Sequence, residues 1–191
     1  MTVQGEPADA MAEDYAALLR AGEGGVYVAL EVPDLTTADV AANKLRLKMR
    51  RSSSGPWRFL SFPPGSQAAA VFFSSGGIKV NDPDSLVSHR PGLVGLAEAW
   101  LEGGRELGLL LQRLGAKKCG TARSPTGAIG ERWGLSHGTL VIVPPRPATR
   151  HRVLGVALRR TAVAGTRNAI VYPHRDFWLH YRADPSGSGD Q

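Results

Sequence analysis

Apolar residues recur along this chain at two spacings, which divide its first half into expected strands and helices. Alternating or continuous apolar runs predict strands at 26–32, 57–62, 68–73 and 78–80. Apolar residues at helical spacing predict helices at about 36–50 and 92–114. These elements make one unit in the order strand, helix, three strands and helix.

A less clear series of elements follows this unit. The expected segments are a strand at 116–121, a short helix at 128–135, strands at 138–143 and 152–160, and a hairpin of 168–172 with 177–181. Helices that all pack on one face of such a sheet leave its other face free. We therefore expect an α+β fold of two pseudo-repeats, each a curved antiparallel sheet with helices on one face, and an additional N-terminal helix.

The expected elements divide the chain into four parts. Residues 1–24 are an acidic N-terminal helix or extension, 25–115 the first repeat, 116–183 a second repeat without a closing helix, and 184–191 a polar, disordered tail. Only the order of elements indicates the duplication, because the two halves share no visible identity.

Composition favours a basic intracellular protein with a polyanionic partner. The chain has 191 residues, 42% of them hydrophobic, and a net charge of +6 at pH 7. Most of the positive charge is arginine, whose planar guanidinium suits phosphate. The single cysteine, Cys119, excludes an internal disulfide and a cysteine-based zinc cluster, and it fits a reducing compartment. No apolar run approaches the roughly 20 residues of a membrane span, so we expect no membrane partner.

Basic residues gather at the end of the expected helix at 36–50 and shortly beyond it. The residues we expect to contact DNA phosphates are Arg46, Lys48, Arg50, Arg51 and Arg58, with Lys79, Arg152 and Arg159 further along the chain. The alternative is a solvated helix end, since cations are favoured at a helix C-terminus by the helix dipole.

Four short segments resemble the TATA-box-binding protein family. The run Ala-Val-Phe-Phe-Ser-Ser-Gly-Gly-Ile-Lys-Val at 70–80 and the helix end Gln-Arg-Leu-Gly at 112–115 resemble parts of its first repeat. Ser-His-Gly-Thr at 136–139 and Val-Leu-Gly-Val at 153–156 resemble parts of its second. The sequence departs from the family at the asparagine of each first strand, where it offers Val26 or Tyr27, and Lys117 or Lys118.

The resemblance implies a saddle that binds the minor groove and inserts apolar side chains between base steps. It places these wedges at Trp57 and Phe73 at one end, and at Val153 and Tyr172 at the other. The strand at 57–62 argues partly against this. Trp57 and Phe59 share a face, so Trp57 cannot be a wedge while Phe59 is buried unless a bulge intervenes.

The leading hypothesis is a non-enzymatic, monomeric, minor-groove DNA-binding protein that acts in transcription initiation or as an architectural factor. Its expected partners are double-stranded DNA and components of the transcription machinery. It needs no cofactor, and its expected location is the nucleus or a viral or prokaryotic equivalent.

Two alternatives stay open. One is a basic interaction or assembly protein, such as a viral structural component, that binds nucleic acid without sequence preference. The other is a hydrolase or metal site. Its candidate residues are His137, His174, Asp176 and His180.

Overall fold

The computed structural model describes residues 27–63, 66, 68–76, 93–146, 152–160, 169–172 and 177–183. The first elements are β1 (Val28–Glu31), α2 (Leu35–Lys44), β2 (Arg50–Ser54), β3 (Trp57–Ser61) and β4 (Val71–Gly76). The next are β5 (Leu93–Glu102), α4 (Arg105–Arg113), β6 (Lys117–Arg123), β7 (Ile129–Gly134) and β8 (Thr139–Val143). The last are β9 (Val153–Arg160), β10 (Ala169–Tyr172) and β11 (Phe177–Ala183).

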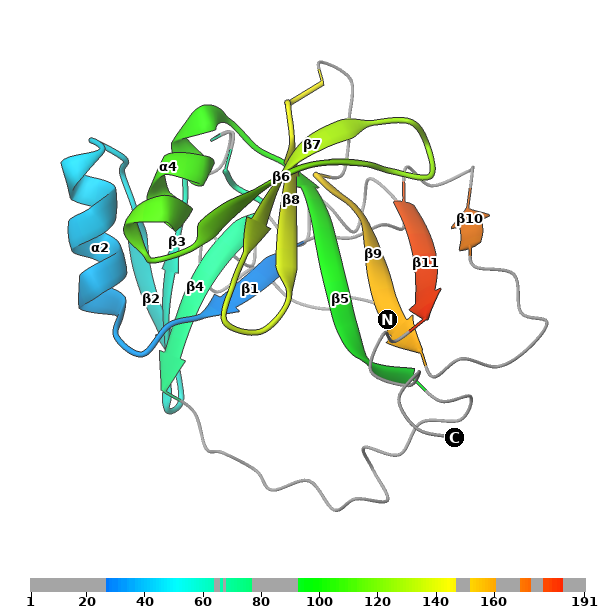
Figure 1. Cartoon of the computed structure of the whole chain (residues 1–191). Coiled ribbons are helices and arrows are strands. Elements are labelled where there is room, and N and C mark those ends of the chain that lie inside the picture. Colours follow the sequence, from blue (N-terminus) through cyan, green and yellow to red (C-terminus); the bar gives the residue numbers. More distant parts are fainter. Residues whose placement is uncertain are drawn as a thin grey trace, which may run out of the picture.

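The strands form two sheets in which one arrangement occurs twice (Figure 1). In the four-stranded sheet the order is β1-β4-β3-β2, and β1 runs parallel to β4. In the seven-stranded sheet the part β5-β8-β7-β6 has the same order, and β5 runs parallel to β8. Each helix connects the first two strands of its unit. The chain therefore contains two units of strand, helix and three strands, at 28–76 and 93–143.

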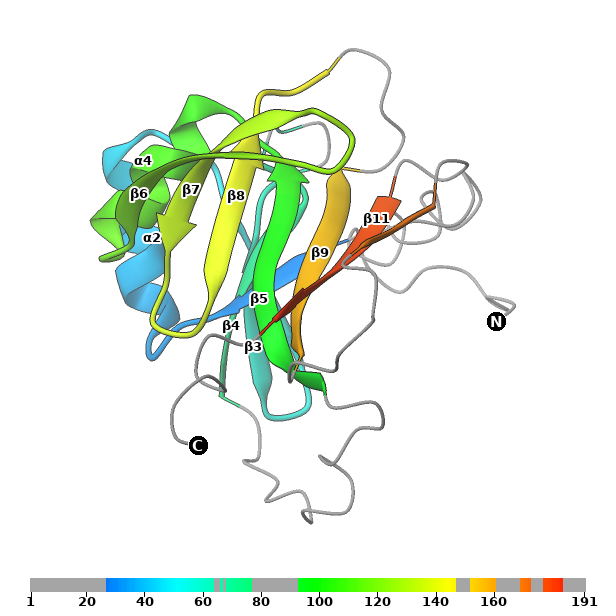
Figure 2. The same ribbon diagram turned by 45° about the vertical axis from the view of Figure 1, so that its right-hand side comes forward.

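Three further strands extend the seven-stranded sheet beyond β5. Strand β9 pairs antiparallel with β5, β11 parallel with β9, and β10 antiparallel with β11. Figure 2 shows this sheet running from β6 through β8, β5 and β9 to β11. The fold is α+β as expected, but its two sheets are mixed. The prediction of antiparallel sheets is wrong, because three strand pairs are parallel.

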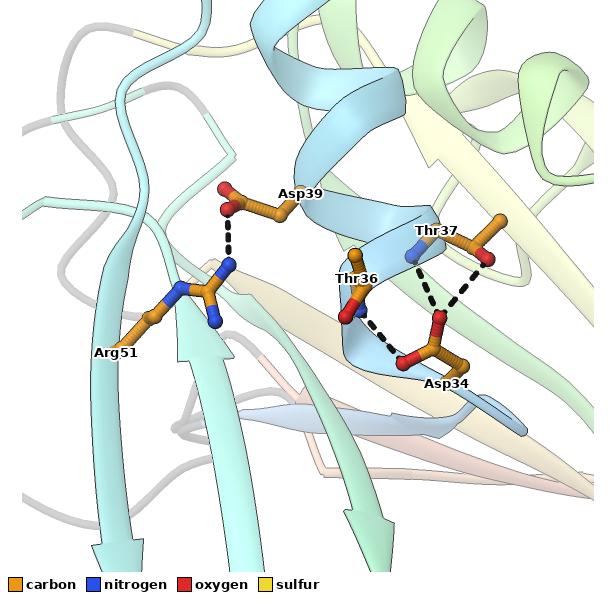
Figure 3. Close-up of polar contacts among 5 residues, drawn as sticks. All are labelled: Asp34, Thr36, Thr37, Asp39 and Arg51. Atoms are coloured by element: carbon orange, nitrogen blue, oxygen red, sulfur yellow. Dashed lines mark hydrogen bonds and ion pairs between the residues drawn. The ribbon is translucent and has the colours of Figure 1, made fainter.

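Helix α2 begins at a capped turn and ends earlier than the sequence suggested. The carboxylate of Asp34 accepts hydrogen bonds from the backbone N–H groups of Thr36 and Thr37, at 2.9 and 3.1 Å (Figure 3). Further along the helix, Asp39 forms an ion pair with Arg51 of β2. The helix ends at Lys44, and Arg46 then adopts a positive φ of 56° that helical backbone does not allow.

The largest difference from the expected elements lies at 92–114. This segment is not one helix but the strand β5 followed by the helix α4, with Gly103 and Gly104 between them. Residues 98–104 are all buried. A strand buried on both faces carries a continuous apolar run, and such a run is not distinguished from a helix by periodicity. The expected helix at 128–135 is likewise the strand β7, and the predicted helix end at 50 belongs to β2.

Several expected strands are present close to their predicted bounds. They correspond to β1, β3, β4, β6, β8 and β9, and the expected C-terminal hairpin corresponds to β10 and β11. The expected division of the chain at residue 115 falls inside the second unit, between α4 and β6. The N-terminal helix, the strand at 78–80 and the tail at 184–191 lie outside the described residues.

Two apolar clusters fill the interior. The larger one joins both units, because it contains α2 and α4 together with residues of β3, β4, β5, β7 and β8, such as Leu60, Phe73 and Leu101. The smaller one lies on the opposite face of the seven-stranded sheet and is made of Trp100, Val141, Val143, Leu154, Ala157 and Trp178. No residue of the two described helices belongs to the smaller cluster. We call this side of the seven-stranded sheet the helix-free face.

Candidate functional site

Strand register brings polar residues together on the helix-free face. One row of paired residues crosses β11, β9, β5, β8 and β7, and its members are Trp178, Gly155, Trp100, Val141 and Arg132. The neighbouring row contains His180, Ala157 and Glu98. Because side chains alternate along a strand, Trp178, His180 and Arg182 of β11 share one face. The middle of the sheet therefore carries charged side chains among tryptophans.

Glu98 is the centre of this arrangement. The residue is only 3% exposed although it carries a carboxylate. Its Oε1 atom lies 2.7 Å from Nη2 of Arg132 and 2.8 Å from Nη1 of Arg182. Its Oε2 atom accepts a hydrogen bond of 3.0 Å from Nε1 of Trp100. Three strands, β5, β7 and β11, thus meet at one buried carboxylate.

The two tryptophans of the smaller cluster form a wall beside Glu98. The rings of Trp100 and Trp178 pack edge to face with their centroids 5.4 Å apart. Gly155 makes room for this pair, since a Cβ atom at that position would lie 2.3 Å from Cδ2 of Trp178. The glycine on β9 therefore sets where the indole of Trp178 lies.

Two buried N–H groups on this face have no hydrogen-bond partner among the described residues. They are Nε of Arg132 and Nε1 of Trp178. Buried donors in folded proteins almost always find an acceptor, from the protein, water or a ligand. A third such group, Nε1 of Trp133, lies in the larger cluster on the helix side of the sheet.

His180 lies beside the Glu98 network in a neutral form. Burial lowers the pKa of the His180 imidazole below its ordinary 6.5, and the positive charge of Arg182 lowers it further, while the negative charge of Glu98 acts in the opposite direction. At pH 7 the imidazole is therefore uncharged. A neutral imidazole beside a ligand can accept a proton or a hydrogen bond.

A second buried carboxylate lies further along β5. Glu102 is 2% exposed, and its Oε1 atom lies 2.7 Å from Nε of Arg146. Glu98, Trp100 and Glu102 thus occupy alternate positions of one strand. Each acid is bound by arginine.

The metal hypothesis gains no support from the part of the chain that the structure describes. Those residues contain no group of three or more His, Cys, Asp and Glu side chains that could hold a metal ion. His137 is exposed near the start of β8, and His174 and Asp176 lie outside the described residues.

A pocket of about 220 Å³ lies away from the helix-free face, at the beginning of α4. Its lining consists of Leu47, Ser66, Ala68, Gly104, Glu106 and Leu107. None of these described residues carries a buried N or O atom without a partner. The pocket therefore lacks the unsatisfied donors that distinguish the helix-free face.

The structure does not gather the predicted DNA wedges on one surface. Phe73 is 1% exposed in the larger cluster, and Val153 is 3% exposed at the start of β9. Trp57 is 40% exposed at the start of β3, on the other sheet from Val153. Tyr172 ends β10, and the structure does not describe its side chain. Phe73 and Val153 are packing residues.

The predicted phosphate contacts are also divided between the sheets. Arg46, Lys48 and Arg50 are exposed in or before β2, and Arg51 is bound by Asp39. Arg58 donates to the carbonyl oxygens of Gly55 and Trp57, at 2.9 and 3.1 Å. Arg152 donates to the carbonyl oxygen of Ser66, Arg159 is exposed on β9, and Lys79 lies outside the described residues.

No protein-family model matches the sequence, and no curated protein is similar enough to match it. Among solved structures, the chain is similar to a hypothetical protein from Staphylococcus aureus, at 8% identity and a TM-score of 0.49, with 82% of this chain and 64% of that one covered. A mutant glyoxalase I from Zea mays gives 15% identity and a TM-score of 0.45, with 83% and 68% covered. A catechol 2,3-dioxygenase gives 11% identity and a TM-score of 0.48, with 87% and 75% covered.

The chain thus spans less than two thirds of the Staphylococcus aureus protein, and no activity is carried over at these TM-scores. Two of these three structures are named as a glyoxalase and a dioxygenase, and none is named as a TATA-box-binding protein. The parallel pairs also have no place in the expected saddle. The prediction of a TATA-box-binding family member is wrong, and so is the function of minor-groove transcription factor. In the part of the chain that the structure describes, the short matches that suggested it fall on β4, on the end of α4, on the turn before β8 and on β9, in another topology.

The remaining expectations concern enzymatic activity, the partner, the oligomeric state and the location. The expectation of a non-enzymatic protein is not confirmed, and structures at these TM-scores decide nothing about activity. The DNA partner, the monomeric state and the location stay predictions. Among the described residues, no helix is long and apolar enough to cross a membrane.

The site residues that were not predicted from the sequence are Glu98, Trp100, Arg132 and Arg182. One signal was present in the segment from Ala97 to Glu102, where two acids stand four positions apart in an otherwise apolar run. An acid inside a buried strand needs a partner. The arginines themselves, far away in sequence, carry no such signal.

Proposed function

We propose that this chain binds a small organic molecule on the helix-free face, next to Glu98, Arg132 and Trp178. The observation that supports it is the buried Glu98 network in the middle of a sheet. Removing charges from water costs free energy, and an apolar side chain of similar volume often stabilises such a position as well or better. A buried carboxylate with two arginines therefore stabilises a core less well than apolar side chains would. Its hydrogen bonds do, however, fix the orientation of guanidinium groups that can bind a ligand.

The exposure of the two arginines supports the same proposal. The Glu98 side chain is 4% exposed, whereas those of Arg132 and Arg182 are 32% and 35% exposed. The carboxylate is thus enclosed while its partners reach toward solvent. The tryptophan pair is buried, with Trp100 0% and Trp178 2% exposed, so a ligand that approaches this face meets the guanidinium groups first.

The four tryptophans provide a direct test of this proposal. Each indole N–H gives its own signal in a proton–nitrogen correlation spectrum, and Trp→Phe variants assign them. We would screen a library of small organic molecules for changes in these signals. The expected result is a set of compounds that shift Trp100 and Trp178 and leave Trp57 and Trp133 unchanged. Compounds that shift only Trp57 or Trp133, or none at all, would contradict the proposal.

A second candidate function is acid–base catalysis on the bound molecule, and the neutral His180 favours it. The chemistry would be removal of a proton from the ligand by the imidazole. For compounds from the screen that carry an acidic C–H group, NMR in heavy water measures exchange of that proton. The His180→Gln variant should still bind the compound but lose the accelerated exchange. Equal exchange with and without protein would exclude this candidate.

A further inference from the structure

We propose that the ligand of the helix-free face is a carboxylate, and that Nε of Arg132 and Nε1 of Trp178 donate to it while Glu98 positions the arginine. This inference rests on the proposed function and names the chemical class of its ligand. Three observations support it: the charge balance around Glu98, the two donors without acceptors among the described residues, and the edge-to-face pair of indoles.

The charge balance leaves the site positive. One carboxylate, Glu98, lies between two guanidinium groups, those of Arg132 and Arg182. His180 adds no charge at pH 7, because its pKa is lowered. One positive charge therefore remains without a counter-ion in this group. In a partly buried position an anion is attracted more strongly than at an exposed surface, where water weakens the interaction.

The unpartnered donors are the groups that such an anion would satisfy, and because both are buried the anion must enter the face to reach them. The bond from Arg132 to Glu98 uses Nη2, so Nε of the same guanidinium remains without an acceptor among the described residues. Trp178 is 2% exposed, and its Nε1 also has no acceptor in the described part of the chain. Both groups can only donate. A cation would meet the same charge as the arginine, and a neutral amide would leave the positive charge unbalanced.

The rest of the site holds these donors in fixed positions. Glu98 fixes one end of the Arg132 guanidinium at 2.7 Å, and the edge-to-face contact with Trp100 together with Gly155 fixes the indole of Trp178. Fixed donors lose little freedom when a ligand binds. Glu98 is thus a positioning residue that does not touch the ligand itself.

Benzoate and benzamide provide a matched pair of probes, because they share a ring and differ in the charged group. Titration of the protein with each, followed on the Trp100 indole signal, gives two dissociation constants. We expect benzoate to bind at least about tenfold more tightly than benzamide, the factor typical of a hydrogen bond to a charged group. Equal affinities would overturn the carboxylate assignment.

Single substitutions locate the donors. Trp178→Phe keeps an aromatic ring and removes the N–H group, and Arg132→Lys keeps the charge and removes Nε. Each should weaken benzoate about tenfold and change benzamide little. Trp57→Phe, on the four-stranded sheet, is the control and should change neither. Unchanged benzoate affinity in both Trp178→Phe and Arg132→Lys would overturn the proposed donors. If one variant does not fold, the other decides.

The possible results distinguish a failure of the carboxylate inference from a failure of the proposed small-molecule binding. If neutral compounds shift Trp100 and Trp178 while benzoate does not, the face binds small molecules and the carboxylate inference is wrong. If neither class shifts these two indoles, both proposals fall together. If benzoate binds and the two variants lose it, both are supported.

Discussion

Glu98 places a buried charge in a sheet whose two core clusters are otherwise apolar. The carboxylate makes contacts with Arg132, Arg182 and Trp100, which come from three strands. Its removal would leave both guanidinium groups without their partner in a place that water reaches only in part. The energetic consequence depends on how far the arginines can turn outward, since each is about one third exposed.

Glu98→Gln should lower the free energy of unfolding by about 1–3 kcal/mol. The value lies below the usual range for a broken buried ion pair, because solvent can still reach the arginines. Urea unfolding measures it. The matched control is Glu131→Gln, whose partner Lys118 lies at a surface position, with both side chains about half exposed. That change should alter stability by less than about 1 kcal/mol, and equal effects of the two substitutions would contradict the role of Glu98.

His180 predicts a dependence of stability on pH. Its pKa in the folded protein lies below 6.5, the ordinary value of the unfolded chain. Between these two values the unfolded chain binds more protons, so stability is complete above pH 6.5 and falls as the pH decreases below it. Urea midpoints measured from pH 8 to pH 5 should therefore fall less in His180→Gln than in the wild type. Parallel pH profiles would show that His180 is not buried as described.

At the scale of elements, the sequence predicted most strands near their bounds but predicted helices where β5 and β7 lie. The strands β1, β3 and β8 have the apolar and β-branched residues that a sheet needs, and they were predicted near their bounds. The segment 92–114 was wrong because Leu93, Leu96 and Trp100 fit a helical spacing by coincidence. Only the partners on β8 and β9, which the sequence does not reveal, show that β5 is a central strand.

The contact between β9 and β11 gives a test at the same scale. Strand β11 runs parallel to β9 with Trp178 opposite Gly155, and a methyl group at Gly155 would collide with the indole. Gly155→Ala should therefore destabilise the protein by about 1–3 kcal/mol, as overpacking does, and should shift the Trp178 indole signal. In the background of Trp178→Leu, the same substitution should have much less effect. An equal effect in both backgrounds would show that the ring does not lie against Gly155.

At the scale of the whole molecule, the chain is built from two units of the same topology that share one core. The order of strand, helix and three strands was visible in the sequence, but the second unit was placed after residue 115 instead of at β5. The mistake followed from taking β5 and α4 as a single closing helix. The sequence already offered His180 and the two acids of 97–102 as signals, but it could not place Glu98, Arg132 and Arg182 together, because they meet only through the pairing of distant strands.

A shared core predicts that the two units unfold together. Leu60 of β3 is 1% exposed and belongs to the same cluster as Leu101 of β5 and Leu110 of α4. Leu60→Ala should lower the free energy of unfolding by about 2–5 kcal/mol. The loss should appear equally in signals from Trp57 of the first unit and Trp133 of the second. Two separate transitions, with only that of Trp57 displaced, would contradict a single core.

The most direct test of the central claim is a crystal structure of the protein with benzoate bound. We expect the carboxylate to lie within hydrogen-bond distance of Nε of Arg132 and Nε1 of Trp178, with Glu98 still between the two arginines. Benzoate in the pocket lined by Leu47 and Leu107 at the beginning of α4, or a helix-free face without room for a ligand, would contradict it.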